Sequence, residues 1–174
     1  MPAVSDEQLT GMLGTESQYY IKGGNYKTVC NGSVLQWQLY VNRDNKLYNK
    51  FAMSESLLWN DCSTDKDEVV KTEIKRKVVK ILGHECDEII LTGNTVKQTH
   101  YFSSKLKIDA KMFAKCKLYG FNKYTELTNA IPLKSIVELE QFTLETEAVE
   151  VKAMKLDDKF FELPPDAETA PSPY

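Results

Sequence analysis

The chain has 174 residues, of which 42% are hydrophobic and 27% are charged, and its formal net charge at pH 7 is −3. This length predicts one domain with a substantial core, since a chain of this size buries roughly two-thirds of its unfolded surface. The hydrophobic content excludes a disordered chain, and the negative charge argues against a general nucleic-acid binder. No apolar run approaches the ~20 residues that cross a bilayer as a helix. We therefore expect a folded domain with no transmembrane segment and no nucleic-acid partner.

The first predicted element is a short helix from Ser5 to Leu13. Ser5 is a suitable N-cap, and Gln8 stands three residues later, where it completes a capping box. From residue 18 onward the pattern changes to alternating apolar and polar residues, which is typical of strands. Residues 18–30 predict a long strand with a bulge or sharp bend at Gly23-Gly24, because glycine tolerates the backbone angles of such a bend.

Further strands follow at intervals of about ten residues, separated by turn signals such as Asn31-Gly32 and Gly93-Asn94. This regular spacing indicates an antiparallel sheet. The acidic loop 61–68 lacks the spacing of a calcium-binding loop, and we interpret it as a solvated connection. The predicted strands are residues 34–42, 46–51, 57–60, 73–82, 88–92 and 96–103.

The alternation stops at residues 109–127, where apolar residues recur at helical spacing. Asp109 is the expected N-cap, and Gly120 is expected to end or kink this helix. A last hairpin is predicted from strands 135–146 and 147–156. Composition predicts a disordered tail in residues 164–174. The sequence therefore indicates a mainly β protein with one main helix and a short N-terminal helix.

Four cysteines are candidates for disulfides: Cys30, Cys62, Cys86 and Cys116. Their even number and wide spacing favour disulfides in an exported protein, and the pairing Cys30–Cys62 with Cys86–Cys116 would close two local units. The alternative is four buried free thiols in a cytosolic protein, since free cysteine packs as a small hydrophobe. The acidic N-terminal residues do not form a signal peptide, which leaves a cytosolic protein or a mature exported chain.

Catalytic chemistry has little support in the sequence. His84 and Cys86 share a strand face, so a Cys–His pair is geometrically conceivable, but no third orienting group is recognisable. His100 alternates in phase with strand neighbours and is interpreted as a sheet residue. The sequence has no phosphate-binding loop, no hydrolase serine motif and no zinc spacing. We expect no enzyme activity, no metal and no cofactor.

Aromatic residues are spread over most of the predicted strands. They either fill the core between the sheet and the helix, or line a curved sheet whose concave face accepts an acyl chain or another apolar ligand. The basic run 71–80 is interrupted by apolar residues and is interpreted as a solvated strand face. The residues predicted to line an apolar ligand site are Trp37, Leu39, Tyr101, Phe113, Leu133 and Phe142.

The order of several short motifs resembles a known family. These motifs are ILGHECDEII at 81–90, YIKGGNYK at 20–27, THYFS at 99–103, IPLK at 131–134 and DKFFELP at 158–164. Together they resemble the LolA/LppX-like superfamily of periplasmic proteins of Gram-negative bacteria, within it the uncharacterised branch with a GLPGLI-type motif. In this sequence Lys27 stands where the family's early strand carries arginine, and Ala130 stands where its G-L-P-L element carries glycine.

The resemblance implies a single domain over residues 1–163, folded as an unclosed antiparallel β-barrel with helices over the concave side of a strongly curved sheet. Characterised members carry lipoproteins or lipids between sheet and helices, without catalytic residues or a cofactor. We therefore expect a non-enzymatic, periplasmic or envelope-associated protein that binds a lipid or other apolar ligand. The alternative is an envelope module with a filled core that binds a protein or a glycan. A cytoplasmic location is the alternative to export.

Overall fold

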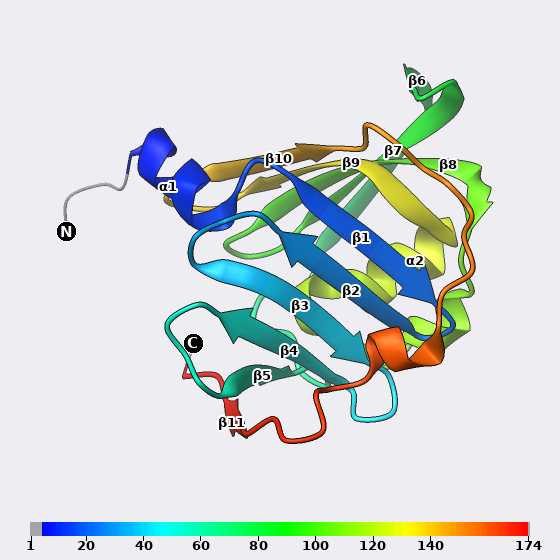
Figure 1. The fold of residues 1–174 in the computed structure, drawn as a ribbon. Coiled ribbons are helices and arrows are strands. Elements are labelled where there is room, and N and C mark those ends of the chain that lie inside the picture. The colour runs from blue at the N-terminus through cyan, green and yellow to red at the C-terminus, as the bar shows by residue number, and fades with distance from the viewer. Residues whose placement is uncertain (1–4, 174) are drawn as a thin grey trace. The chain divides into compact units, whose positions relative to one another are not determined.

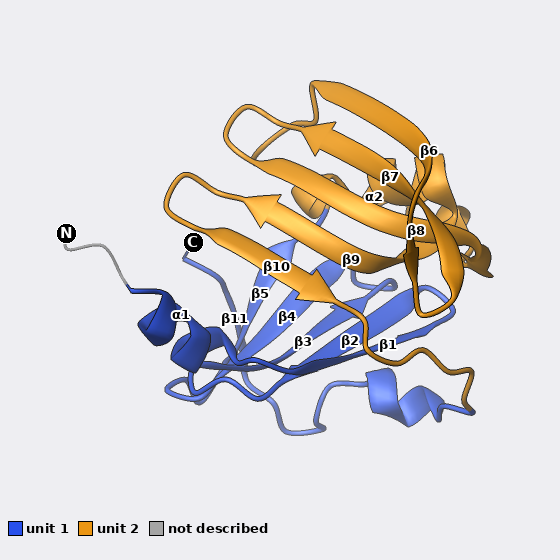
Figure 2. Cartoon of the chain, turned by 90° about the horizontal axis from the view of Figure 1, so that it is seen from above, with its two compact units in different colours: residues 1–62, 155–174 blue, residues 63–154 orange. Residues whose placement is uncertain are grey.

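The computed structural model describes residues 5–173 of the chain. The fold is mainly β, with 46% of residues in strands and 16% in helices, and its two sheets are not closed into a barrel. This confirms the predicted fold class. The chain divides into two compact units, residues 1–62 with 155–174 (unit 1) and residues 63–154 (unit 2) (Figure 2). The sequence predicts one domain. In the structure, each of the two units has its own sheet and its own buried apolar residues.

Unit 1 begins with helix α1 (Asp6–Leu13), which starts at the predicted capping box. The Ser5 hydroxyl accepts a hydrogen bond from the Gln8 backbone N–H (3.2 Å), and the Gln8 side chain accepts one from the Ser5 N–H (3.0 Å). These two bonds satisfy donors that the first helical turn leaves without intrahelical partners. The local sequence alone therefore determined where this helix begins.

The sheet of unit 1 has six strands in the order β1-β2-β3-β4-β5-β11 (Figure 1). The predicted bend at Gly23-Gly24 is a complete hairpin turn, with Gly23 at φ 58°, so the long strand expected over 18–30 is two paired strands. The first five strands pair antiparallel in chain order. Their bounds are β1 (Ser17–Lys22), β2 (Asn25–Cys30), β3 (Leu35–Val41), β4 (Lys46–Phe51) and β5 (Leu57–Asp61).

The C-terminal residues return to this sheet, where the sequence predicted a disordered tail from residue 164. They form the 3-10 helix η3 (Asp158–Phe161) and strand β11 (Thr169–Pro171), which pairs parallel with β5. The Leu57 N–H donates to the Glu168 carbonyl, and the Ser172 N–H donates to the Trp59 carbonyl, both at 2.8 Å. The tail is ordered because the open edge of β5 offers these backbone groups, which composition cannot reveal.

Unit 2 contains a five-stranded antiparallel sheet in the order β10-β9-β8-β7-β6. The final hairpin lies earlier than predicted, because its turn is at residues 139–142 and not between residues 146 and 147. Extended backbone already begins at Ala130, so the last two strands are shifted toward the N-terminus. The strands are β6 (Lys71–Ile81), β7 (His84–Thr92), β8 (Lys97–Lys107), β9 (Ala130–Glu138) and β10 (Thr143–Glu147).

The helix predicted over 109–127 is three short pieces: η1 (Ala110–Phe113), η2 (Leu118–Gly120) and α2 (Phe121–Thr128). The predicted cap is confirmed, since the Asp109 carboxylate accepts from the Lys111 N–H at 3.0 Å. The predicted kink at Gly120 is confirmed by its φ of 65°. A Cβ at Gly120 would lie 2.6 Å from Val69 Cγ2, so close packing also requires glycine there.

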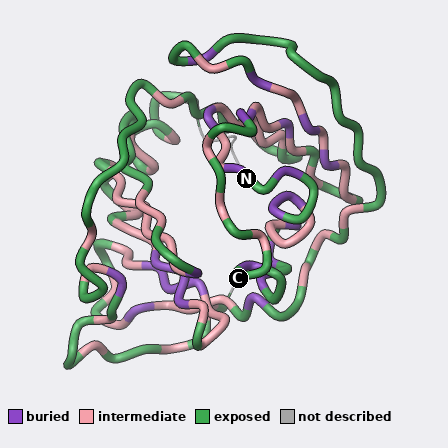
Figure 3. The backbone as a smooth tube through the Cα atoms, turned by 90° about the vertical axis from the view of Figure 1, so that its right-hand side faces the viewer, coloured by how far each residue is buried: buried purple, intermediate pink, exposed green. Residues whose placement is uncertain are grey.

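Clusters of buried apolar residues lie in both units of the described chain, while most turns are exposed (Figure 3). Of two such clusters in unit 2, the larger joins β7, β8, β9 and α2, and the smaller joins β6, β7 and β9. The buried members are Leu39, Val41, Tyr48, Leu57 and Phe161 in unit 1; Ile89, Leu91, Phe102, Tyr124 and Ala130; and Ile81, Cys86 and Leu133.

Candidate functional site

One face of the unit 1 sheet carries a row of apolar side chains that contains a single cation. The strand register places one residue from each of five neighbouring strands side by side. Residues directly opposite each other in an antiparallel sheet share a face, so all five project to the same side. We call this side the covered face. Its central row is Tyr20, Lys27, Leu39, Tyr48 and Trp59.

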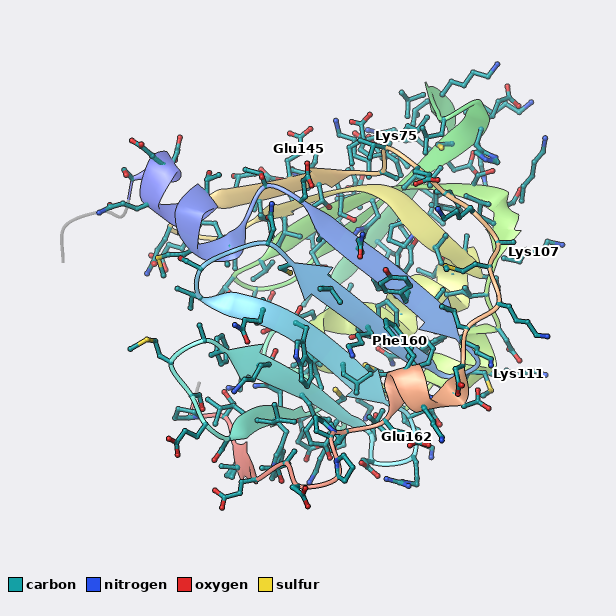
Figure 4. The ribbon with its side chains drawn as sticks, viewed as in Figure 1. Lys75, Lys107, Lys111, Glu145, Phe160 and Glu162 are labelled. Carbon is teal, nitrogen blue, oxygen red and sulfur yellow. The ribbon has the colours of Figure 1, made fainter. Side chains whose placement is uncertain are left out.

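The C-terminal segment packs on the covered face. Phe161 is buried there at 4% exposure, and Phe160 beside it places its ring 4.8 Å from the ring of Tyr20. Figure 4 shows Phe160 projecting from η3 beside the strands of unit 1. Leu156, Leu163 and Ala167 pack against the same cluster. Residues 156–167 therefore act as an apolar cover over this sheet.

Lys27 is held between two aromatic rings on the covered face. Its Nζ lies 5.1 Å from the centre of the Trp37 ring and 4.6 Å from that of Phe160. The Phe160 carbonyl oxygen is 3.5 Å away and provides a long hydrogen bond. Burial lowers the pKa of the Lys27 amine below its usual value. The faces of the two rings attract the ammonium, which compensates part of the hydration it loses.

No carboxylate of residues 5–173 forms an ion pair with Lys27. Lys22 on the neighbouring strand β1 differs from Lys27 in having a carboxylate partner. It binds Asp158 at 2.8 Å and donates to the Leu156 carbonyl at 2.6 Å. A partly desolvated ammonium without a counter-ion is less stable than one that is paired. The Lys27 position therefore favours an anionic group brought by a ligand.

The structure separates the six residues predicted to line one apolar site. Trp37 and Leu39 lie together on the covered face of unit 1. Tyr101 and Leu133 lie together in the smaller cluster of unit 2. The fully buried ring of Phe113 packs edge-on against that of Phe121, 5.3 Å away. Phe142 is half-buried in the turn between β9 and β10, where its carbonyl accepts from the Leu139 N–H.

The predicted disulfides are not formed. All four cysteines lie within residues 5–173, and all four are free thiols. Three of them, Cys62, Cys86 and Cys116, are buried, and Cys30 is half-buried. Burial raises the pKa of the Cys30 and Cys86 thiols. These residues fit the alternative reading of cysteine as a small core hydrophobe, which spacing alone could not distinguish from pairing.

The conceivable Cys86–His84 pair is not assembled. The Cys86 thiol donates to the backbone carbonyl of His84 at 3.4 Å. Because burial raises the pKa of this thiol, the nucleophilic thiolate is disfavoured. Neither the geometry nor the charge state of Cys86 is that of an activated nucleophile.

His100 is the centre of a polar group that the sequence did not predict. Its Nδ1 lies 2.8 Å from Ser135 Oγ, and its Nε2 lies 3.3 Å from Gln98 Oε1. The Gln98 amide nitrogen donates to the Tyr119 carbonyl at 3.0 Å, which leaves its oxygen to face the imidazole. Nε2 therefore carries the proton, and Ser135 donates to Nδ1. Register pairs His100 with Ser135 across β8 and β9, a contact between residues 35 apart in sequence.

Because His100 is buried, we expect the free energy of unfolding to depend on pH. Burial lowers the pKa of His100 to about 4. The unfolded chain, with an ordinary histidine pKa near ~6.5, then binds a proton first as pH falls, so stability present at pH 7 is lost on acidification. We expect the free energy of unfolding in urea to fall by about 2 kcal/mol from pH 7 to pH 5 through this residue.

His100→Gln should remove most of that loss between pH 7 and pH 5. His84→Gln is the matched control and should retain it, because His100 is still in place. An unchanged pH dependence in His100→Gln would show that the imidazole is not the responsible group.

The acidic loop between β5 and β6 is structural in unit 2. Asp67 accepts hydrogen bonds from the N–H and hydroxyl of Thr95 (2.8 and 3.1 Å) and from the Val96 N–H (3.0 Å). Burial alone would raise the pKa of Asp67, but these hydrogen bonds outweigh it and lower the pKa. Asp65 accepts from the Gly120 N–H at 3.0 Å. Across residues 5–173, no three His, Cys, Asp or Glu side chains are grouped to hold a metal ion.

Comparisons of the chain with protein-family models, with curated proteins and with solved structures return no match. In the described part of the chain, no helix has the length and apolar character needed to cross a membrane. The covered face, where Lys27 lies between the rings of Trp37 and Phe160 and Lys46 lies 3.6 Å from the centre of the Trp59 ring, is the arrangement in the described residues that most directly suggests a ligand.

Proposed function

We propose that this protein is a non-enzymatic binding protein that takes an amphiphile, an apolar chain with an anionic head group, on the covered face of unit 1. The observation that carries the proposal is Lys27, an ammonium between Trp37 and Phe160 without a carboxylate partner in residues 5–173. A carboxylate or phosphate at Nζ would supply the missing counter-charge. The aromatic and aliphatic residues around it would bury the chain.

The cover explains how such a ligand could enter. Residues 156–167 pack on the face through side chains. The backbone hydrogen bonds that join the C-terminal segment to β5 come from the following residues 168–172. Phe160 and Leu156 are only half-buried. An acyl chain has the same apolar character as these side chains, so it can replace their contacts while its head group gains the ion pair with Lys27.

Tryptophan fluorescence tests this proposal directly. The chain has two tryptophans, and both, Trp37 and Trp59, lie on the covered face. We expect saturable fluorescence changes on titration with dodecanoate below its micelle concentration. Lys27→Met should weaken dodecanoate binding about tenfold or more, since a hydrogen bond to a charged group is worth about 1.5–3 kcal/mol. Lys27→Arg should retain most of the affinity.

Two controls separate the charge from the apolar face. Dodecanol has the same chain without the anion, and its binding should be insensitive to Lys27→Met. Lys97→Met removes a lysine of unit 2 that already has a carboxylate partner, Glu138, and should leave dodecanoate affinity within about twofold. No saturable signal with wild-type protein, or equal losses for both ligands in Lys27→Met, would overturn the proposal.

The second candidate function is an interaction module with a filled core, which binds a protein or a glycan and no small molecule. The observation in its favour is that the chain's own Phe160 and Phe161 already occupy the covered face. Native mass spectrometry of the purified chain distinguishes the two candidates. A co-purifying adduct lost on denaturation supports the amphiphile carrier, whereas a bare chain after incubation with dodecanoate and phospholipid supports the module.

For either function we propose a place in the cell envelope, periplasmic in a Gram-negative cell. The support for this location is the order of motifs that resembles the LolA/LppX-like superfamily. Fractionation of cells expressing the natural gene tests it, because recovery in the periplasmic fraction supports the location and recovery with cytoplasmic markers contradicts it.

A further inference from the structure

The two edge strands of the unit 2 sheet have opposite charge. β6 forms one edge and β10 the other, with three strands between them (Figure 2). Residues 71–80 of β6 and all five residues of β10 are exposed. An exposed edge presents unpaired backbone N–H and C=O groups that can pair with another strand. Within the described chain, both edge strands of this sheet can therefore pair with a further strand.

β6 is a basic edge, with five cations and one carboxylate in eleven residues. Three of the cations bind acids of the neighbouring strand β7: Lys75 binds Glu88, Arg76 binds Asp87 and Lys77 binds Glu85. Their side chains remain more than 60% exposed, so they still face an approaching strand. Lys80 has no ion pair among residues 5–173.

β10 is an acidic edge, with Glu145 and Glu147 and no basic residue in its sequence TLETE. Both glutamates bind the same lysine, Lys134 of β9, at 2.6 and 3.1 Å. One cation serves two anions, which leaves an excess of negative charge on this edge. Figure 4 shows Glu145 pointing away from the sheet.

Each edge also carries exposed apolar side chains that pairing would cover. On β6 these are Ile74, Val78 and Val79, which are 37%, 42% and 41% exposed. On β10 the apolar residue is Leu144, at 40%. β-Branched residues on an open edge favour strand pairing, and the charges around them decide which strand is accepted.

Like edges cannot pair well. β6 is irregular between Lys75 and Val79, where Lys77 has a φ of 50°. Two paired β6 strands would set the five cations and one carboxylate of each strand against the same charges of the other. Two β10 strands would place Glu145 against itself. Like charges directly opposite each other on a sheet are destabilising, whereas opposite charges contribute about 0.2–1 kcal/mol per pair. A basic edge against an acidic edge is the combination that these charges allow.

We propose that copies of this chain associate through unlike edges, with β10 of one copy pairing with β6 of the next. In a five-stranded antiparallel sheet the first and fifth strands run in the same direction, so direct continuation of the sheet makes this pair parallel. The interface is heterologous: each copy keeps one free edge, and association continues into chains or closes into a ring. Five residues of strand form a small contact, so assembly is weak and depends on concentration.

Sedimentation equilibrium of the full chain tests the proposal. The weight-average mass should rise from 19.9 kDa at low micromolar concentration to about twice that value near 0.5 mM, as a dissociation constant of ~0.1–1 mM implies. In 1 M NaCl, where the Debye length falls to about 3 Å, association should weaken severalfold.

Edge variants determine which strands pair. Lys71→Glu with Lys80→Glu removes the net positive charge of β6, because three cations then stand beside three carboxylates. Thr143→Lys with Glu145→Lys makes β10 net positive while leaving Lys134 bound to Glu147. Each double variant alone should remain monomeric near 0.5 mM, and an equimolar mixture should regain association, because it contains one native edge of each kind. Lys71→Arg with Lys80→Arg preserves charge and should associate like wild type. Circular dichroism melts show that each variant is folded.

Three outcomes would overturn the proposal. The first is a wild-type chain that stays at 19.9 kDa over the whole concentration range. The second is self-association of either of these two double variants alone to the wild-type extent, which would indicate pairing of like edges or another surface. The third is a mixture of the two folded variants that remains monomeric.

Discussion

Phe161→Ala is expected to reduce the free energy of unfolding by about 3–5 kcal/mol, the usual cost of removing a buried aromatic side chain. Phe161 is 4% exposed and packs with Leu39, Tyr48 and Leu57 of the sheet in unit 1. Its loss leaves a cavity under the C-terminal cover, and neighbouring strands cannot close a cavity of that size completely. Urea unfolding followed by tryptophan fluorescence measures the loss, since both tryptophans lie in the same cluster.

Met53→Ala provides the control for Phe161→Ala. Met53 lies in the turn after β4 and is 95% exposed, so its removal should change stability by less than about 0.5 kcal/mol. A loss below 1 kcal/mol in Phe161→Ala, on the order of a surface substitution, would show that the C-terminal segment does not contribute to the core of unit 1. A cover that is lost easily would also agree with ligand entry by displacement of residues 156–167.

Asp67→Ala is the second substitution with a large expected effect, a loss of about 2–4 kcal/mol in the stability of unit 2. The Asp67 carboxylate accepts three hydrogen bonds from Thr95 and Val96 in the turn between β7 and β8. A hydrogen bond to a charged group contributes about 1.5–3 kcal/mol, and water replaces part of it when the acceptor is removed. Amide hydrogen exchange at Thr95 and Val96 should accelerate in the variant.

Two further variants make this prediction specific. Asp67→Asn keeps one oxygen acceptor and should lose roughly half as much stability as Asp67→Ala. Glu68→Ala changes the adjacent exposed carboxylate and should have no measurable effect. If Asp67→Ala and Glu68→Ala behave alike, the turn is held by other contacts and the carboxylate is dispensable.

Elements with local signals were predictable to within one or two residues. Helix α1 begins at its capping box, and β4 occupies the predicted residues 46–51, since turn residues flank it on both sides. The alternation in β3 correctly assigned Trp37, Leu39 and Val41 to one face, which is the face of the unit 1 cluster. In each case neighbouring residues contain all the information that specifies the element.

Predictions failed where distant residues decide the backbone. The segment 109–127 has helical spacing, but Tyr119 and Gly120 take positive φ, and Gly120 donates to Asp65, which lies 55 residues earlier in the chain. The polar, proline-containing C-terminus looks disordered, but β5 offers it an edge. Propensity is a weak prior when a tertiary contact of this kind competes with it.

In the candidate site, too, some features follow from neighbouring residues and others from contacts between distant residues. Sequence alone determined a mainly antiparallel β protein, the first helix, most strands and turns, and the apolar face that carries Trp37 and Leu39, because these depend on period and on turn chemistry within a few residues. Only the tertiary structure decided that the chain forms two units, that its cysteines are free, and that Phe160 lies over Lys27, 133 residues away in sequence. Contacts at that separation depend on how whole elements pack, and no local pattern encodes which partners they bring together.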